Sequence, residues 1–472
     1  VRYLDTFDRR LRRAGLVLEH VTLPGTTGMR YRECGHARTL VDAPGAPLPA
    51  FARDIAHTRL RALIAPVIDI RRLLVVAETR GRLTVVGGRD REDKTVIVVE
   101  CLAAHRGPIR LTVRPLQGYE RFAQRAIRRL RTVEEVVPDE SEPMLAASDG
   151  PGAAFGDEKG PVRPDLNREE RSDIACKRLL AHLDAVLEMN QPGIEADLDP
   201  ECLHDFRVAT RKARSLLREM RRVFPRNVTR RLRTDLGWLG QCTGPVRDLD
   251  VHLMDFSAGV DGAESGADDA TAALHAHLEA TRNREYRALC RTLRSARYRR
   301  VRSAFRKFLE TAPPARPRSE NALVPVAVLS AARILKVYRQ ILSEGRAIGD
   351  ASPPESLHEL RKTCKRLRYL LEFFRDIHPA RPVQRTIARL KRLQDNLGAF
   401  QDVQVQRAVL EEFRERAEAS LGAAAIDAID RQCAALMERE KKTRAEFAAR
   451  FADYDSKPAH KAFAAALGRK RK

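Results

Sequence analysis

The sequence contains two copies of one segment, and this duplication limits the fold more than any other feature. Residues 203–225 read LHDFRVATRKARSLLREMRRVFP, and residues 357–379 read LHELRKTCKRLRYLLEFFRDIHP. The two copies align without a gap at an offset of 154 residues, and the same offset pairs Asp248 with Asp402 farther along the chain. Chance does not hold one register over such a length, so the sequence predicts two copies of one structural unit.

Apolar residues recur at steps of three and four in both copies, which is the period of a helix with one buried face. The predicted buried residues are Leu203, Phe206, Thr210, Ala213, Leu217 and Met220 in the first copy and Leu357, Leu360, Cys364, Leu367, Leu371 and Phe374 in the second. Each copy has room for about four helices. Residues 167–456 are therefore expected to form an all-α domain of two repeated four-helix bundles, repeat one over 167–310 and repeat two over 323–456.

A second stripe lies one residue later, about 100° around each helix, and it is basic. It contains His204, Arg207, Arg211, Arg214 and Arg218 in the first copy and His358, Arg361, Lys365 and Arg368 in the second, and Lys212 and Arg366 widen it. Like charges on neighbouring turns repel, and no acidic residue lies within either stripe over its first three turns. Phosphate oxygens would relieve this repulsion, and the planar guanidinium group suits them. The alternative is an ordinary solvated charged face.

Each basic stripe begins with a histidine in the first turn of its predicted helix. Asp199 and Pro200 give the first helix a start signal, and prolines at 353 and 354 do so for the second. A histidine at this place can donate to an anion, whose charge favours imidazolium, or it can bridge neighbouring helices. The sequence leaves both roles open. No serine or cysteine nucleophile pattern accompanies either histidine, so no catalytic residue is predicted.

The charge of the whole chain favours a polyanionic partner. Its 472 residues include 87 Lys and Arg against 64 Asp and Glu, a formal charge of +23. Such a surplus attracts phosphate-rich polymers through steering and counterion release, although biased codon usage also raises arginine content. Aromatic residues make up 5% of the chain, which is few for a protein that stacks nucleobases.

Cysteine usage and hydropathy bear on the compartment. The 8 cysteines are scattered without a C-x-x-C pair, which is typical of a reduced, intracellular protein without a zinc site. His275 and His277 have no evident third ligand, so no metal site is predicted. No apolar run reaches the roughly 18 residues of a membrane span, and the N-terminus does not read as a signal peptide. We expect a soluble, cytoplasmic protein with no membrane contact; the oligomeric state stays open.

Residues 1–133 differ in composition from the helical region. A helix is predicted over 117–132, and short β-branched runs predict strands at 73–77, 83–86 and 95–99. Residues 134–166 are predicted to be an acidic, flexible linker. Residues 457–472 are predicted to be a basic tail.

The duplicated pattern L-H-x-x-R-x-x-x-[RK]-[KR]-x-R-x-L-L resembles the CHAD domain, a family named for its histidine-bearing α-helices. The resemblance covers about 167–470. Within this region, the segments 243–250 (TGPVRDLD) and 397–404 (LGAFQDVQ) are also similar to the family's second-helix segment. The resemblance implies two four-helix bundles around a basic central cavity. It also implies binding of inorganic polyphosphate and, in bacteria, attachment to polyphosphate granules.

The resemblance also implies which residues contact polyphosphate. By position these are His204, Arg207, Arg211, Lys212 and Arg214 in the first copy and His358, Arg361, Lys362, Lys365, Arg366 and Arg368 in the second. Arg218 and Arg247 complete the predicted site. Glu372 and Gln401 stand at their places in the second copy, which is therefore expected to bind less strongly at its far end. The arginines and lysines are expected to supply most of the affinity.

The N-terminal region resembles part of a CYTH domain, the triphosphate tunnel fold. The segment Tyr3-Leu4-Asp5-Thr6 with Leu11 and Gly15 matches that family's Y-x-D-T…L…G pattern, and Gly118-Tyr119 is also similar. The family's E-x-E-x-K strand, which supplies metal ligands and a lysine, is absent. The segment 95–102 offers only Glu100, and Glu19 stands where an arginine is expected. The predicted fold class is thus an α+β, partial CYTH-like β-barrel followed by the all-α domain.

Three functions remain to be compared. Polyphosphate binding with granule association is the leading prediction. Triphosphate hydrolysis or cyclisation by the CYTH-like region would need Mg²⁺ or Mn²⁺, and the shortage of clustered carboxylates weighs against such an enzyme. Nonspecific nucleic-acid binding through the same cations is the third, weakened by the few aromatics and the lack of a DNA-reading motif. Otherwise no cofactor is predicted.

Overall fold

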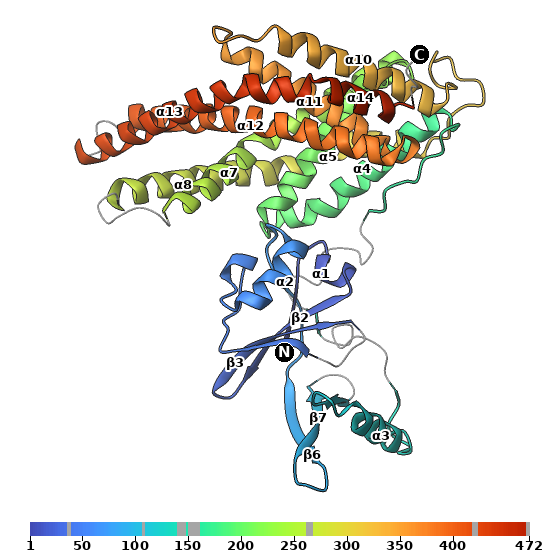
Figure 1. The fold of residues 1–472 in the computed structure, drawn as a ribbon, viewed down its shortest axis with the longest axis vertical. Coiled ribbons are helices and arrows are strands. Elements are labelled where there is room, and N and C mark those ends of the chain that lie inside the picture. Colours follow the sequence, from blue (N-terminus) through green and yellow to red (C-terminus); the bar gives the residue numbers. More distant parts are fainter. Residues whose placement is uncertain are drawn as a thin grey trace. The chain divides into compact units, whose positions relative to one another are not determined.

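The computed structural model describes residues 1–34, 39–105, 109–138, 148–149, 161–260, 268–417 and 423–468. They form two compact units. The sheet unit comprises Val1–Val162 with Glu188–Leu203, and the helical unit comprises Arg163–Leu187 with His204–Lys472. Figure 1 traces the strands of the first and the long helices of the second.

The sheet unit contains two antiparallel sheets. The larger has the order β4-β3-β2-β1-β5-β9, and the smaller has the order β6-β7-β8. The strands are β1 (Arg2–Asp5), β2 (Leu16–Leu23), β3 (Thr26–Glu33), β4 (Thr39–Pro44), β5 (Leu74–Glu78), β6 (Gly81–Arg89), β7 (Thr95–Ala104), β8 (Ile109–Pro115) and β9 (Ser148–Asp149). The helical elements are α1 (Arg10–Arg13), η1 (Ala52–Asp54), α2 (Thr58–Ile68) and α3 (Glu120–Leu130).

A tight hairpin and one amphipathic helix organise the core of the larger sheet. Leu23 of β2 pairs with Thr26 of β3 across Pro24-Gly25, and Gly25 has a φ of 77°, which favours glycine. In α2, Leu60, Ile64 and Ile68 recur every four residues and are fully buried in the same cluster as Leu18 of β2.

The predicted strands at 73–77, 83–86 and 95–99 are confirmed as β5, β6 and β7, and the predicted helix at 117–132 is confirmed as α3. The CYTH-like partial barrel is not confirmed. The described strands belong to two separate hydrogen-bonded sheets, because β6 to β8 pair only with one another.

The repeat is visible in the helix boundaries. The first repeat contains α4 (Ser172–Glu195), α5 (Pro200–Glu219), α6 (Arg226–Cys242), α7 (Gly244–Val260), α8 (Asp268–Leu293) and α9 (Ala296–Glu310). The second contains α10 (Val326–Arg346), α11 (Pro354–Phe373), α12 (Ala380–Ala417), α13 (Ala423–Tyr454) and α14 (Lys457–Ala466), with a 3-10 turn η3 (Arg375–Ile377). Helices α10, α11 and α12 begin 154 residues after α4, α5 and α6. The prolines at 200 and 354 begin α5 and α11, as predicted.

Two repeated four-helix bundles are not confirmed, because the described residues of the first repeat form six helices and those of the second form five. Pro245 explains the difference. It has no backbone N–H, and the helix breaks beside it into α6 and α7. Ala399 takes its place in the second repeat, where α12 runs unbroken alongside α13 (Figure 1).

The buried stripes predicted for the two repeated helices are confirmed, because all twelve residues are buried, from Leu203 to Met220 in α5 and its C-terminal turn and from Leu357 to Phe374 in α11 and its C-cap. The predicted tail was wrong for residues 457–466, which form α14. The Phe463 ring stacks 3.5 Å from that of Tyr338, so this segment belongs to the core.

Most of the predicted linker over 134–166 lies outside the described residues. Within it, Ser148–Asp149 form β9 on the edge of the larger sheet, and Leu166 is buried in the helical unit. No helix among the described residues is long and apolar enough to cross a membrane.

Candidate functional site

Side chains of α5 and α11, one helix from each repeat, meet in the helical unit. Lys212 Nζ lies 2.9 Å from Glu372 Oε2, and Arg366 Nε lies 2.8 Å from Glu219 Oε1. The Lys212 ammonium also lies 5.7 Å from the centre of the Tyr369 ring. The tertiary structure therefore brings the two predicted basic stripes onto one surface, which we call the basic surface.

Two equivalent arginines anchor this surface to the helix that follows in each repeat. Arg207 Nη1 donates to Gly240 O at 2.9 Å and to Thr243 Oγ1 at 3.1 Å, at the break between α6 and α7. Arg207 Nη2 lies 4.0 Å from Asp248 Oδ1. In the second repeat, Arg361 Nη2 lies 3.6 Å from Asp402 Oδ1.

A glycine lies beside each of the two guanidinium groups. A Cβ atom at Gly244 would lie 3.4 Å from Arg207 Nη1, and one at Gly398 would lie 3.8 Å from Arg361 Nη2, which are ordinary van der Waals distances. The arginine, glycine and aspartate thus form one local arrangement that occurs twice.

Burial lowers the pKa of both arginines. Asp248 opposes this for Arg207, and Arg211 and Arg247 lower its pKa further. For Arg361, Asp402 opposes the effect of burial and Arg211 adds to it. Arg211 of the first repeat therefore lies close enough to Arg361 of the second for repulsion between them.

Burial and neighbouring arginines both disfavour the charged form of Lys365. Burial, together with the nearby charges of Arg361, Arg211 and Arg368, lowers its pKa to about 8, while Asp402 opposes them. The Nε of Arg211 is itself buried with no hydrogen-bond acceptor among the described atoms. In the described part of the chain, neither Lys365 nor Arg211 has a carboxylate within ion-pair distance. An anion seated between them would supply the missing acceptor and counter-charge.

The helical region of the sequence resembles known proteins. Residues 177–411 match the family model of the CHAD domain. These residues form a CHAD domain. The region matched begins in α4 and ends in α12, so it includes both repeated basic helices.

Two solved structures resemble the chain. The CHAD domain from the plant Ricinus communis has 25% sequence identity and a TM-score of 0.49; the match covers 66% of this chain and 96% of that one. PptA from Streptomyces chartreusis has 15% identity and a TM-score of 0.47, over 60% of this chain and 99% of that one. No curated protein matches the sequence.

Several predicted cations of the CHAD domain are already neutralised by carboxylates. Glu219 is 5% exposed and accepts from Arg366 and from Arg218, the latter at 2.9 Å. Although burial alone would raise it, these two arginines hold the pKa of Glu219 below its usual value. Glu372 is shared by Lys212 and Arg368, whose Nε lies 3.3 Å away. These four cations are therefore less available to a ligand than Lys365 and Arg211.

The histidine in the first turns of α11 bridges two helices of the CHAD domain. His358 Nδ1 donates to Oε1 of Gln401 in α12. Gln401 stands 154 residues after Arg247, so the residue that departs from the first repeat is the one that holds the histidine. With Nδ1 engaged, only Nε2 could meet an anion. His204 lies half-buried at the equivalent place in α5.

Three predicted residues lie at the margin of the basic surface. Arg247 is half-buried in α7, near enough to Arg207 to lower its pKa. Arg214 is exposed, and its Nη2 would lie 3.5 Å from a Cβ at Gly237. Lys362 is exposed and lies 2.7 Å from Glu359 on its own helix. None of these three lies against the pair Lys365 and Arg211 in any contact described.

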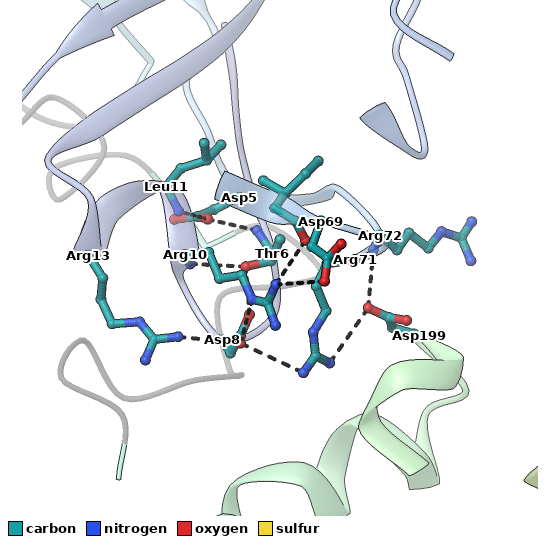
Figure 2. Close-up of polar contacts among 11 residues, drawn as sticks. Asp5, Thr6, Asp8, Arg10, Leu11, Arg13, Asp69, Arg71, Arg72 and Asp199 are labelled. Atoms are coloured by element: carbon teal, nitrogen blue, oxygen red, sulfur yellow. Dashed lines mark hydrogen bonds and ion pairs between the residues drawn. The ribbon is translucent and has the colours of Figure 1, made fainter. Parts of the chain in front are cut away.

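A second polar cluster lies in the sheet unit and has a structural role (Figure 2). Asp5 accepts from the backbone N–H groups of Thr6, Leu11 and Arg12 at 2.7, 2.9 and 3.1 Å, which caps the first turn of α1. Burial raises the pKa of Asp5 to about 6. Asp5 of the Y-x-D-T segment thus stabilises the connection from β1 to α1.

Arg71 lies at the centre of the same cluster and is 1% exposed. Its Nη2 lies 3.8 Å from Asp8 Oδ2, and its Nη1 lies 4.0 Å from Asp199 Oδ2 (Figure 2). The guanidinium carbon lies 4.7 Å from the Phe7 ring centre. Its two carboxylate neighbours make Arg71 a structural ion-pair centre.

Two glutamates of the sheets are also paired with arginines. Glu19 in β2 accepts from Arg32 at 3.0 Å, and Glu100 in β7 pairs with Arg114 and, at 3.4 Å, with Arg30. No group of three or more His, Cys, Asp or Glu residues in the described ranges could hold a metal ion. These pairs use the oxygens that a divalent ion would need.

Sequence reasoning missed the carboxylates that neutralise the basic stripes. Asp248 and Asp402 recur at the repeat offset and lie opposite equivalent arginines, so the duplication itself was the signal that could have found them. For Glu219 and Glu372, the sequence repeat gives no indication that they neutralise the basic stripes. They lie at adjacent, not equivalent, positions of the two repeats.

Proposed function

We propose that the CHAD domain of this chain binds inorganic polyphosphate on the basic surface between α5 and α11. The observation that carries this proposal is the approach of Arg211 and Lys365, from different repeats, without a carboxylate partner for either within the described ranges. CHAD domains are associated with polyphosphate binding, and the family match includes both helices.

The chemistry of the surface favours a phosphate polymer over nucleic acid. Arginine and lysine donors suit phosphate oxygens, and a desolvated lysine gains most from a neighbouring anion. The ring next to these cations, Tyr369, is buried and is not placed to stack on a base. Polyphosphate is a flexible chain, so it can follow a surface that two repeats form together, whereas duplex DNA has a fixed helical shape.

The direct test compares a double variant with a control of equal charge. Arg211→Gln with Lys365→Gln removes the two cations that lack a carboxylate partner. The control, Lys441→Gln with Arg450→Gln, removes two exposed, ion-paired cations of α13. Binding of labelled long-chain polyphosphate is measured at physiological salt, with duplex DNA as competitor.

We expect the double variant to weaken polyphosphate binding by roughly tenfold for each charge-assisted hydrogen bond lost, with the control close to the unaltered protein. Changing His204, Arg207 and Arg211 with His358, Arg361 and Lys365 to alanine together should abolish binding. Equal weakening in the control, or DNA competing as well as polyphosphate, would contradict the proposal.

We further propose that the protein associates with polyphosphate granules. A fluorescent fusion of the full chain should form foci that coincide with granule stain in a polyphosphate-producing cell. The Arg211→Gln, Lys365→Gln variant should be diffuse at the same expression level. Foci that persist in cells unable to make polyphosphate would contradict this localisation.

A further inference from the structure

Each repeat of the helical unit has a groove that takes no part in the basic surface. The groove of the first repeat lies between α6 and α9 and encloses about 370 Å³. The groove of the second lies between α12 and α14 and encloses about 570 Å³. We call them groove one and groove two.

The two grooves are equivalent under the sequence repeat. Arg231 and Lys307 line groove one, and Arg385 and Lys461, each 154 residues later, line groove two. The same offset relates Val228 to Pro382, Ala304 to Pro458, Phe308 to Ala462 and Thr311 to Ala465. One ancestral groove is therefore present twice, and its two copies have diverged.

Charge and volume both differ between the copies. Arg231 in groove one lies 3.9 Å from Asp235, whereas Arg389 takes the place of that aspartate in groove two. Phe308 fills part of groove one and packs edge-on against Phe224, whereas Ala462 leaves that space open in groove two. Groove two is thus larger than groove one, and it has a cation where the first repeat has an aspartate.

A segment of the chain itself lies along groove one. Thr311, Pro314, Pro317 and Ser319 line it as a proline-rich wall. Lys177 Nζ donates to the carbonyl oxygen of Thr311, and Arg171 Nη2 donates to that of Pro314 at 2.8 Å. The described lining of groove two comes from α12 and α14, and no equivalent of this wall is found among the described residues.

Three cations of groove two are not paired with a carboxylate among the described residues, and two of them, Arg385 and Lys461, are exposed to solvent. Arg389 Nη1 is buried with no hydrogen-bond acceptor among the described atoms, and Arg385 and Lys461 have no ion pair within that part of the chain. Arg392 is the exception, because it lies 2.9 Å from Asp453. Between these cations the groove is lined by small apolar residues, namely Pro382, Ala388, Pro458, Ala462 and Ala465.

Groove two is separate from the basic surface. Arg389 and Gly398 are nine residues apart in α12, which places them about half a turn out of phase. Gly398 faces Arg361 on the basic surface, so Arg389 faces away from it. A ligand in groove two would not compete for Lys365 and Arg211.

We propose that groove two binds an extended acidic segment of a partner protein, in the place that residues 311–319 take in groove one. Carboxylates of the partner would accept from Arg385, Arg389 and Lys461, and apolar side chains between them would cover the prolines and alanines. A polyphosphate chain could meet the cations but has no apolar group for this lining, so a peptide fits both features of the groove.

The test uses a short labelled peptide of repeated Glu-Pro-Leu-Glu units and the same peptide with Gln in place of Glu. Binding is measured by fluorescence anisotropy on the full chain. The groove-two variant is Arg385→Glu with Lys461→Glu. The matched control is Arg231→Glu with Lys307→Glu, which makes the same charge change at the equivalent positions. A third variant, Ala462→Phe, fills groove two as Phe308 fills groove one, without altering charge.

We expect the acidic peptide to bind the unaltered protein and the control, and to bind at least tenfold more weakly to the groove-two and Ala462→Phe variants. Polyphosphate binding should be retained by Ala462→Phe. Equal binding of the Gln peptide, equal loss in the control, or no loss in Ala462→Phe would overturn the proposal. Short-chain polyphosphate that displaces the peptide from the Arg211→Gln, Lys365→Gln variant as efficiently as unlabelled peptide would show a phosphate site instead.

Discussion

Glu219, at the end of α5 in the first repeat, accepts from Arg366 of α11 in the second repeat at 2.8 Å. The carboxylate is buried and also accepts from Arg218 on its own helix. One acidic side chain therefore joins the two basic helices that would otherwise repel each other, and it does so where burial makes the contact strong.

Replacing Glu219 with glutamine should destabilise the helical unit. The change leaves two partly buried guanidinium groups without their shared counter-charge, at a cost of roughly 3 kcal/mol in the free energy of unfolding. Urea unfolding followed by circular dichroism measures this loss. The control is Glu320→Gln, whose pair with Arg222 is exposed, and it should change stability by less than about 0.5 kcal/mol. Equal effects of the two changes would contradict the bridging role.

Replacing Glu372 with arginine should strengthen polyphosphate binding. The change frees Lys212 and Arg368 and restores the basic residue that the first repeat has as Arg218. The slope of log Kd against log salt concentration should steepen by roughly 2, since each added phosphate contact contributes a little less than one unit. Glu438→Gln, in an exposed pair with Lys441 on α13, should leave the slope unaltered. If Glu372→Arg leaves the slope unaltered or makes it less steep, the polymer does not contact this part of the basic surface.

Lys365 should make polyphosphate binding depend on pH. Its pKa in the free protein is about 8, and a bound anion raises this value, so binding takes up a proton above pH 8. Affinity should be highest below pH 8 and fall as the pH rises from 8 toward the ordinary lysine pKa. Calorimetric titrations between pH 7 and 10 measure this, and Lys365→Arg should flatten the profile because arginine stays charged.

The same lysine should act on stability in the opposite direction. Its folded-state pKa lies below its unfolded value, so the unfolded chain binds more protons between the two, and stability without ligand should rise with pH from about 8 upward. Thermal unfolding of the unaltered protein and of Lys365→Met in this window gives the difference. A fall in the lysine-dependent stability over this range would contradict the burial of Lys365 among arginines.

Replacing Arg71 with leucine should destabilise the sheet unit. The change leaves Asp8 and Asp199 facing a buried apolar side chain, and the expected loss is about 2 to 3 kcal/mol. The neighbouring side chain of Arg72 is exposed, so Arg72→Ala is the matched control and should cost no more than about 0.5 kcal/mol. Differential scanning calorimetry measures both. Comparable unfolding profiles for the two variants would show that Arg71 is not the centre of the cluster.

Much of the helical architecture could be predicted because it depends on local periodicity. The apolar steps from Leu357 to Phe374 and their counterparts in α5 were all found buried, and the prolines at 200 and 354 mark the helix starts. Helix number was harder to predict. Pro245 splits one repeat where Ala399 leaves the other continuous, and the contact that places α14 in the core, Phe463 on Tyr338, joins residues far apart in the sequence.

The sequence by itself determined the duplication, the buried face of each repeated helix and the row of cations beside it, since these depend on residue spacing within one helix. Only the tertiary structure decided which cations keep an uncompensated charge. Lys212, Arg218, Arg366 and Arg368 share two carboxylates, whereas Arg211 and Lys365 have none in the described ranges. Neutralisation acts over a few ångströms, and the residues that provide it lie far apart along the chain.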